Sequence, residues 1–308
     1  MSAGAVSLER RRVRTAWIFL SPAIAVFAAV AAWPLFRTIW LGLTDAGLGA
    51  ETSGQFVGFS NFLAHDESGW SGLLVDRDWW RAVYNTVTFA GISVVLETVI
   101  GFALALLIDR EFPGRGLLRA AILIPWAIPT IVAARLWGWM LNDQYGVINH
   151  VLLMSGAIHE PVAWIANPAI AYWTVIIADV WKETPYMTLL ILAGLQMLPR
   201  DCFEAARIDG AGPWTIFTRI TLPLIRPALI VAVTFRALDA LRVFDVIYVL
   251  TSNNKRVMSM SMFARRELID FQLAGYGSAA ATLLFLTIAA MTVMFLTATR
   301  SSTVGRLS

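Results

Sequence analysis

Residues 204–227 read EAARIDGAGPWTIFTRITLPLIRP and form a polar, turn-broken island between two long apolar segments. Pro199 suits the first turn of a helix, because its missing N–H costs nothing there, and Gly210 ends that helix about three turns later. A second short helix is predicted over 214–222, where it runs into Pro223. The stretch therefore predicts a helix, a turn and a second helix between two apolar segments.

The first helix of this island carries very small side chains. Ala205, Ala206, Gly210 and Ala211 would let another surface approach the backbone closely, which favours a docking surface for a partner protein. The same pattern also fits an amphipathic connector that lies flat among lipid headgroups. The residues of the island alone leave both interpretations open.

The composition is that of a polytopic membrane protein. The chain has 308 residues, of which 58% are hydrophobic and only 15% charged, with a mean hydropathy of +0.66. Soluble domains carry nearer a quarter of charged residues. The net charge of +3 gives no reason to expect a nucleic-acid partner, and membrane lipid is the expected surroundings. The single cysteine, Cys202, excludes an internal disulfide framework.

Six apolar segments predict an all-α membrane protein with six transmembrane helices. The first segment follows a basic N-terminus, as in a signal peptide, but it is too long for a signal sequence and is predicted to be retained. Pro125 and Pro129 are expected to bend the third segment. The six predicted spans are 17–41, 83–108, 120–140, 169–197, 224–250 and 273–298.

The distribution of basic residues predicts the orientation. With a cytoplasmic N-terminus, the inner segments would hold 13 Lys and Arg residues and the outer loops 6, which agrees with the positive-inside rule. Both termini and the island would then be cytoplasmic. The predicted organisation is a tail over 1–15, a permease domain over 16–298 with its coupling loop at about 198–223, and a tail over 299–308.

Ionisable residues inside the predicted spans are costly and are therefore candidates for function. Span five carries charges that alternate in sign at a spacing of three, so that each would lie one helical turn from its opposite. Glu97 and Arg135 add to the polar set. Mutual neutralisation between helices is one interpretation; a water-accessible path is the other. The candidates for such a path are Asp179, Trp181, Lys182, Glu183, Tyr186, Arg236, Asp239, Arg242, Asp245 and Tyr248.

This mixture of charged and aromatic groups suits a sugar. Charged groups hydrogen-bond hydroxyls, and flat rings cover C–H faces. No G-x-x-x-x-G-K-[ST] loop, H-E-x-x-H pair or G-x-S-x-G elbow occurs, so neither an enzyme nor a metal site is predicted. The energy source is expected in another chain.

The island closely resembles the EAA loop of permease subunits in bacterial ABC importers. The resemblance rests on Glu204-Ala205-Ala206 and Asp209-Gly210-Ala211, followed by Phe217, Ile220, Leu222-Pro223 and Pro227. It extends along most of the chain and is similar to the sugar-importer branch of these permeases, including the first permease subunit of actinobacterial trehalose importers. Further motifs that carry it are 56–62, 181–186, 192–196, 244–251 and 275–279.

The resemblance implies a non-catalytic subunit in a bacterial plasma membrane. Implied partners are a second permease, two ATPase subunits that bind ATP and Mg²⁺, and an extracytoplasmic sugar-binding protein or lipoprotein that delivers the sugar. The residues implied to couple the chain to the ATPase are Glu204, Ala205, Ala206, Asp209, Gly210 and Ala211. Residues 252–256 depart from the family, which often has a glycine-rich run ending in proline here.

Three other functions remain to be weighed. An ion-coupled secondary transporter would use the charges of spans four and five, although no internal repeat is evident. A membrane enzyme lacks a recognisable nucleophile or metal set. A structural scaffold would not explain the charges inside the spans.

Overall fold

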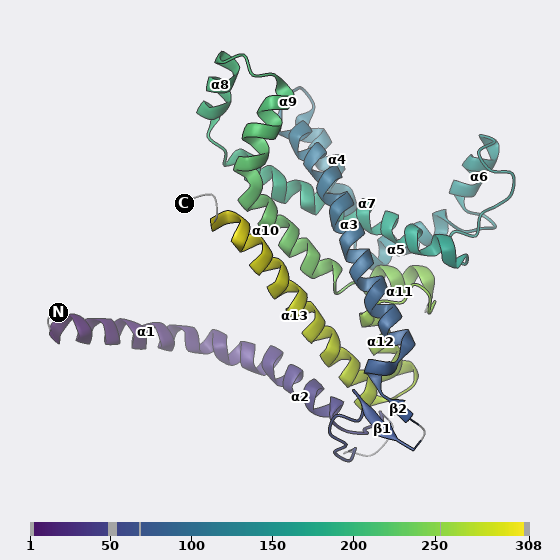
Figure 1. Ribbon diagram of the computed structural model, residues 1–308. Helices are drawn as coiled ribbons and strands as arrows, with labels where there is room; N and C mark the ends of the chain where they lie inside the picture. The colour runs from purple at the N-terminus through teal and green to yellow at the C-terminus, as the bar shows by residue number, and fades with distance from the viewer. Residues whose placement is uncertain (1–2, 49–53, 68, 253, 305–308) are drawn as a thin grey trace. The chain divides into compact units, whose positions relative to one another are not determined.

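The computed structural model describes residues 3–48, 54–67, 69–252 and 254–304, and these are mostly helical (Figure 1). The chain forms two compact units. The first takes residues up to 75 together with 264–283, and the second takes 76–263 and the residues from 284 onward.

The first unit begins with one continuous helical run. It comprises α1 (Ala3–Phe27), the π turn η1 (Ala28–Ala32) and α2 (Trp33–Gly42). A wide turn just before Pro34 suits the proline, because that residue cannot donate the next helical hydrogen bond. The run contains the range 17–41 predicted from the sequence, and none of its most apolar window is buried.

Short elements complete the first unit. Strands β1 (Ala64–Asp66) and β2 (Gly69–Ser71) pair antiparallel with Ala64 opposite Ser71, and the 3₁₀ turn η2 (Leu73–Val75) follows. The end of α12 (Met260–Arg265), the π turn η4 (Arg266–Asp270) and the start of α13 (Ala274–Val304) also belong here. A Cβ at Gly42 would lie only 3.1 Å from the Ala279 backbone, so glycine favours this close approach of α2 to α13.

The second unit is organised around α3 (Arg77–Asp109) and α7 (Pro168–Gln196). Asp76 and Asn167 cap their N-termini with side-chain oxygens that accept backbone N–H groups. The two helices pack closely at Gly101, where an added Cβ would lie 3.1 Å from the Thr188 nitrogen.

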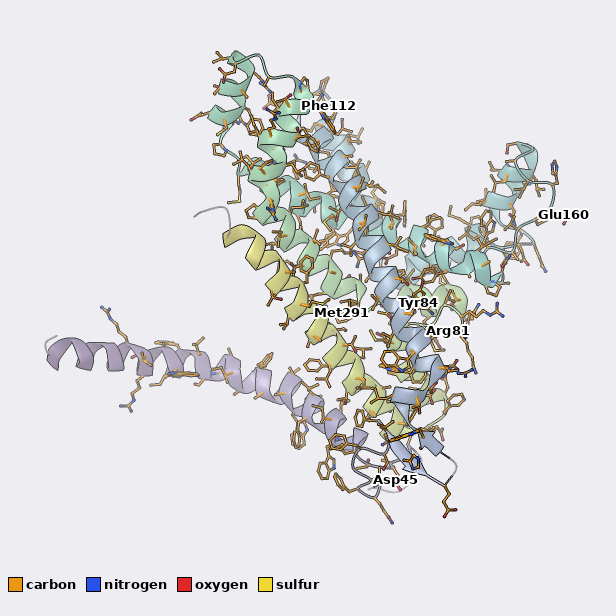
Figure 2. The ribbon with its side chains drawn as sticks, in the orientation of Figure 1. Asp45, Arg81, Tyr84, Phe112, Glu160 and Met291 are labelled. Atoms are coloured by element: carbon orange, nitrogen blue, oxygen red, sulfur yellow. The ribbon has the colours of Figure 1, made fainter. Side chains whose placement is uncertain are left out.

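The second unit contains further helices. They are α4 (Arg115–Ala127), α5 (Thr130–Met140), α6 (Val147–Met154), α8 (Arg200–Ile208), α9 (Pro213–Ile216), the π turn η3 (Phe217–Thr221), α10 (Leu222–Ala240) and α11 (Asp245–Thr251). The hydrophobic core draws on α3, α7 and α10, and includes Phe102, Met187 and Ile225. Met291 of α13 packs against this core from its edge (Figure 2).

Among the described residues, four helices are long and apolar enough to cross a membrane: 12–42, 77–109, 213–240 and 274–298. The pair α4 and α5 makes a fifth if it is counted as one broken span. Helix α7 is outside this count, although it has 29 residues, and it carries Asp179, Lys182 and Glu183 in its middle. The prediction of a mostly helical membrane protein is confirmed at this level.

The third predicted span is broken rather than bent. Helices α4 and α5 meet at an angle of 93° over Ile128 and Pro129. The sequence correctly predicted a distortion at Pro129 but underestimated its size, whereas Pro125 lies inside α4. Pro129 cannot continue the helix, and the extended conformation of Ile128 just before it is the one that a following proline favours.

The fifth predicted span was wrong at both ends. The helix does not stop at Pro223; it runs without interruption from Pro213 to Ala240, because the π turn η3 ends just before that proline and absorbs the lost hydrogen bond. It then ends early. Residues 241–244, the α10–α11 break, separate α10 from α11, so no single helix reaches residue 250.

Two predicted loops contain helices. The loop over 141–168 includes α6, whose Asn149 is buried. The loop over 251–272 contains α12 and η4, and Met258, Met260 and Phe263 in it are at most 1% exposed. The basic residues at both ends of this segment suggested a solvated loop, whereas its apolar middle is packed into the protein.

Candidate functional site

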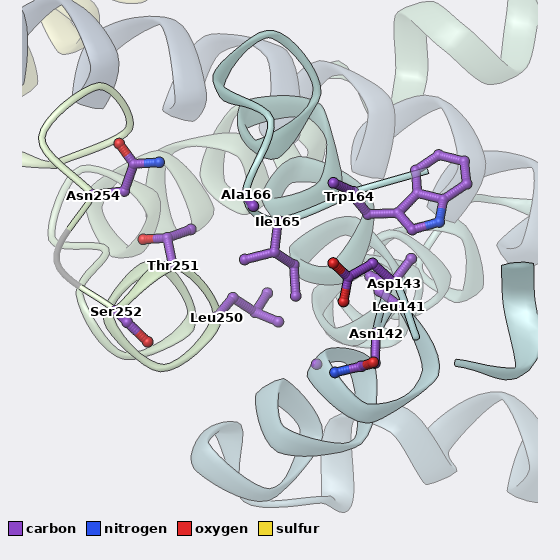
Figure 3. Close-up of a pocket in the computed structure, with 12 residues that line it drawn as sticks. Leu141, Asn142, Asp143, Trp164, Ile165, Ala166, Leu250, Thr251, Ser252 and Asn254 are labelled. Atoms are coloured by element: carbon purple, nitrogen blue, oxygen red, sulfur yellow. The ribbon is translucent and has the colours of Figure 1, made fainter. Parts of the chain in front are cut away.

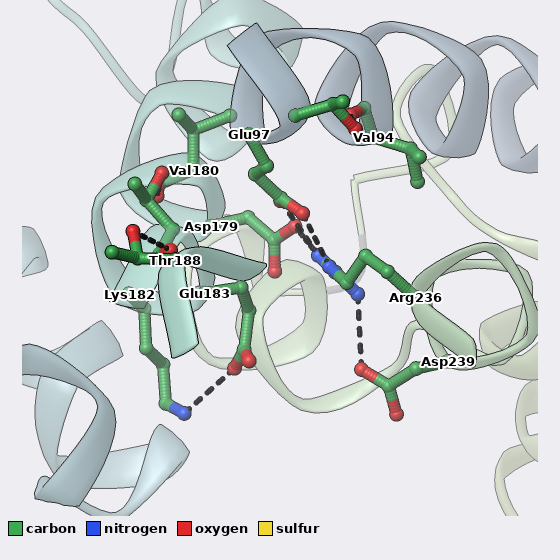
Figure 4. Close-up of polar contacts among 11 residues, drawn as sticks. Val94, Glu97, Asp179, Val180, Lys182, Glu183, Thr188, Arg236 and Asp239 are labelled. Atoms are coloured by element: carbon green, nitrogen blue, oxygen red, sulfur yellow. Dashed lines mark hydrogen bonds and ion pairs between the residues drawn. The ribbon is translucent and has the colours of Figure 1, made fainter. Parts of the chain in front are cut away.

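A buried arginine joins three helices of the second unit. The guanidinium of Arg236 on α10 donates from Nη2 to Glu97 Oε1 of α3 at 2.8 Å, and its Nε donates to the other oxygen of Glu97 (Figure 4). Nη2 also donates to Asp179 of α7, and Nη1 donates to Asp239 at 2.9 Å. Arg236 is 2% exposed and Glu97 0% exposed. This bidentate geometry is the one that suits an arginine and a carboxylate.

The arginine lies at the edge of a charged cavity of about 290 Å³. Its walls come from α5, α7, the end of α10, the α10–α11 break and the start of α11. Four carboxylates and two guanidinium groups line it, so hydrogen-bonding groups of both kinds are available to a polar solute. These six residues are Asp179, Glu183, Arg236, Asp239, Arg242 and Asp245.

The predicted ladder of charges along one helix is present only in its first half. Arg236 and Asp239 form an ion pair one turn apart on α10. Arg242 and Asp245 lie beyond the end of α10, and Arg242 Nε donates to the Leu238 carbonyl at 3.2 Å. Because α10 ends at Ala240, Arg242 and Asp245 do not continue the ladder along that helix, and both line the cavity.

The remaining path candidates lie outside this cavity. Lys182 pairs with Glu183, at 2.8 Å between Nζ and Oε1. The ring of Trp181 meets Trp137 edge to face and lines a separate apolar cleft of about 510 Å³ between α3, α4 and α7. Tyr186 stacks on Trp126. Tyr248 stacks on Phe244, and Phe244 itself lines the charged cavity. The charged candidates other than Lys182 thus line one cavity, and the aromatic candidates do not.

Glu97 is the important residue that the list of path candidates left out. It is the bidentate partner of Arg236, and its position inside an apolar segment was the available signal. Its partner lies 139 residues away, and no local spacing relates the two.

A second, polar pocket of about 350 Å³ lies at the other end of α11 (Figure 3). The side chains of Asn142, Asp143 and Ser252 border it, with Leu250 and Thr251 from the end of α11. Figure 3 labels Asp143, Ile165, Leu250 and Thr251 among the residues that line it. The seven-residue α11 therefore borders one cavity at each end.

The island over 204–212 forms an exposed helix and turn. No residue of α8 is buried. Gly210 has a φ of +76°, the Ala211 N–H donates to the Ala206 carbonyl at 2.9 Å, and the Gly210 N–H donates to the Arg207 carbonyl at 3.1 Å. These two bonds define a Schellman motif, which needs a left-handed residue at this position. Glu204, Ala205 and Asp209 are exposed, and Ala206 and Ala211 are half-buried.

No group of His, Cys, Asp or Glu that could hold a metal ion occurs among the described residues. Cys202, on α8, is a free and exposed thiol.

Long apolar helices, one pair of them broken, beside a charged cavity are features of a polytopic membrane protein. The model of the family "Binding-protein-dependent transport system inner membrane component" matches residues 97–301. The chain belongs to this family, and it is therefore a multi-pass membrane protein of the kind that sits in the inner membrane.

Two relatives match over nearly their whole length. The trehalose/maltose transport system permease protein MalF of Thermococcus litoralis is 41% identical, over 94% of this chain and 95% of the relative. The trehalose transport system permease protein SugA of Mycobacterium tuberculosis is 36% identical, over 92% of this chain and 88% of the relative. The names of both relatives include trehalose.

The fold is also that of solved transporters. A chain of a bacterial ABC transporter involved in the import of the acidic polysaccharide alginate superposes with a TM-score of 0.77 at 22% identity, covering 96% of this chain and 99% of that chain. At this level of identity the match concerns the fold alone. It agrees with the ABC permease fold that the sequence resemblance implied.

Proposed function

We propose that the chain is one permease subunit of an ATP-driven sugar importer and forms half of the path for a disaccharide such as trehalose. The observation that carries this proposal is the similarity of 41% and 36% to two sugar permeases across nearly the entire chain. The charged cavity supports it, because carboxylates and guanidinium groups can hydrogen-bond the hydroxyls of a sugar.

The proposed assembly contains a second permease subunit, two ATPase subunits and an extracytoplasmic binding protein or lipoprotein. The chain itself would be non-catalytic, and ATP and Mg²⁺ would bind to the ATPases. In the membrane it would have six spans with both termini cytoplasmic, between tails over 1–15 and 299–308. Helix α7 and the broken pair α4–α5 would supply the two spans that differ from simple apolar helices.

The coupling surface would be the exposed island, with Glu204, Ala205, Ala206, Asp209, Gly210 and Ala211. The Schellman motif at Gly210 gives α8 a fixed end, and the small side chains allow a partner to approach its backbone. Closure of the ATPases would move this island and, through α7 and α10, alter access to the charged cavity.

Uptake and partner capture test the proposal together. In a strain that lacks the chromosomal gene, the wild-type chain should restore uptake of labelled trehalose, and an ATPase and a sugar-binding protein should copurify with it. Glu204→Lys should remain in the membrane but lose uptake, because it reverses the charge on the coupling surface. Trehalose uptake that persists in the absence of any bound ATPase would contradict the proposal and favour an ion-coupled transporter.

The two glycines of the island provide a matched pair of variants. Gly210→Ser should lower uptake several-fold, because a serine at a φ of +76° costs about 1–2 kcal/mol. Gly212→Ser should leave uptake unchanged, since its φ of −68° at the N-cap of α9 suits serine. An added Cβ meets nothing within 4 Å at either position, so backbone conformation is the only difference. Equal uptake by the two variants would count against a role for this turn.

A further inference from the structure

The α10–α11 break leaves backbone carbonyls that no helix can satisfy. After Ala240, the Arg242 and Val243 N–H groups make only short-range bonds, to Asp239 and Ala240, and Phe244 has a φ of −141° and a ψ of −62°. Inside a membrane protein such groups need partners from elsewhere in the protein. The break also forms one wall of the charged cavity, through residues 242–244.

The missing partners come from the outer segment, residues 254–263. The Ser259 hydroxyl donates to the Val243 carbonyl at 2.8 Å and accepts the Met262 N–H at 3.2 Å. Ser259 is 0% exposed. A second hydroxyl, that of Ser261, donates to the Arg242 carbonyl over a longer distance of 3.4 Å, and Ser261 is less buried than Ser259. Ser259 is therefore the principal link between the outer segment and the cavity wall.

The outer segment is itself held firmly on its other side by α3. Asn85 Nδ2 donates to the carbonyls of Arg256 at 2.9 Å and Met258 at 3.0 Å. The Met260 N–H donates to Thr86 Oγ1 at 2.9 Å. Farther along, the ring of Phe263 meets Trp79 edge to face, with centroids 5.5 Å apart. The segment thus connects a rigid helix to a break that has little support of its own.

We propose that Ser259 is a positioning residue, which holds the α10–α11 break in place and thereby sets the position of Arg242 and Asp245 in the charged cavity. This inference rests on the proposed function, in which that cavity is part of the sugar path. Arg242 and Asp245 lie on either side of Val243 and Phe244, so a shift of the break moves both charges at once. Ser259 itself does not touch the solute.

Cysteine accessibility tests the inference without knowledge of the substrate. The chain has one cysteine, so Cys202→Ser gives a cysteine-free background. Thr130→Cys would report on the charged cavity, and Ala105→Cys, at a position that is 0% exposed in the hydrophobic core, would report on general loosening. The measurement is the rate at which a hydrophilic thiol reagent modifies each reporter in the purified complex.

Ser259→Ala should speed modification of the cavity reporter by roughly two- to tenfold, the range expected for loss of one buried hydrogen bond. The core reporter should stay unreactive, and Ser261→Ala should leave both rates near those of the wild type. Ser259→Thr, which retains the hydroxyl, should restore the slow rate. Equal rates for Ser259→Ala and Ser261→Ala, or faster modification of the core reporter as well, would overturn the inference.

A second measurement needs no variant, in case Ser259→Ala does not accumulate. In the wild-type complex, amide hydrogen exchange over 242–246 and 258–262 should occur with one shared opening rate. Independent exchange of the two segments would overturn the inference. In a separate measurement, trehalose is added to the Thr130→Cys reporter that keeps Ser259. If trehalose fails to slow modification, the proposed substrate is wrong. The comparison of the serine variants still decides the role of Ser259.

Discussion

At the scale of single residues, Arg236 is the side chain on which the buried charges depend. It satisfies Glu97 and Asp179, both of which are nearly inaccessible, and it also reaches Asp239. Exchanging such a hub for an uncharged group would leave two carboxylates without their counter-ion. Removing one partner of a buried ion pair costs more stability than replacing both partners with apolar groups, because the remaining charge is buried without a counter-ion.

Arg236→Ala should therefore lower the stability of the protein by about 3–5 kcal/mol. Arg242→Ala is the matched control, because Arg242 lines the same cavity and makes its one described side-chain hydrogen bond to a backbone carbonyl. The control should keep near wild-type stability while changing solute transport. Thermal unfolding in detergent and the amount of protein in the membrane measure the difference. If both variants are equally stable, Arg236 is not the hub that its contacts indicate.

The sequence predicted most of the residues of this site and little of their arrangement. Charges inside apolar segments are costly, so Asp179, Arg236 and Asp239 could be selected without a structure. The pairing of Arg236 with Glu97 depends on how α3 and α10 meet, which no local spacing encodes. For the same reason the sequence did not predict that the rings of Trp181 and Tyr186 contact other aromatic rings, those of Trp137 and Trp126.

At the scale of elements, the packing of α3 against α7 depends on a glycine. A Cβ at Gly101 would lie 3.1 Å from the Thr188 nitrogen and 3.2 Å from Met187 Cγ, so the two helices would have to separate. Both helices carry partners of Arg236, Glu97 on α3 and Asp179 on α7, and their separation would therefore also loosen the buried charges.

Gly101→Ala should destabilise the protein by about 1–3 kcal/mol, the usual cost of overpacking. Gly91→Ala lies on the same helix with nothing within 4 Å of the added methyl group, and it should be neutral or slightly stabilising. The temperature of half-unfolding of the two variants provides the comparison. A fall of equal size in both would mean that helix flexibility, rather than contact with α7, explains the effect.

The elements that sequence reasoning misplaced share a physical cause. The α10–α11 break reads Leu241-Arg242-Val243-Phe244, without the glycine or proline that normally marks an interruption. The outer segment stabilises it through hydrogen bonds from Ser259 and Ser261, which lie 16 and 19 residues farther along the chain than the carbonyls that they reach. Conversely, Pro223 suggested the end of a helix, but the π turn over 217–221 lets the helix continue past it. In each case contacts or backbone geometry beyond the local sequence decided the outcome.

At the scale of the whole molecule, the single cysteine makes the proposed orientation directly testable. Cys202 is exposed on α8, which the proposal places on the cytoplasmic side. A membrane-impermeant maleimide should leave it unmodified in intact cells and label it in inverted vesicles, and a bound ATPase should slow that labelling. As a control, Ser155→Cys in a Cys202→Ser background, at an exposed position after α6, should show the opposite pattern. Labelling of Cys202 in intact cells would refute the orientation.

The short helix α11 has a mechanical consequence. Its seven residues span about 10 Å, and they border the charged cavity at one end and the polar pocket at the other. A tilt of α11 would move the walls of both cavities at once, because Asp245 lines the charged cavity and Leu250 lines the polar pocket. The shapes of the two cavities are therefore coupled through this one short helix.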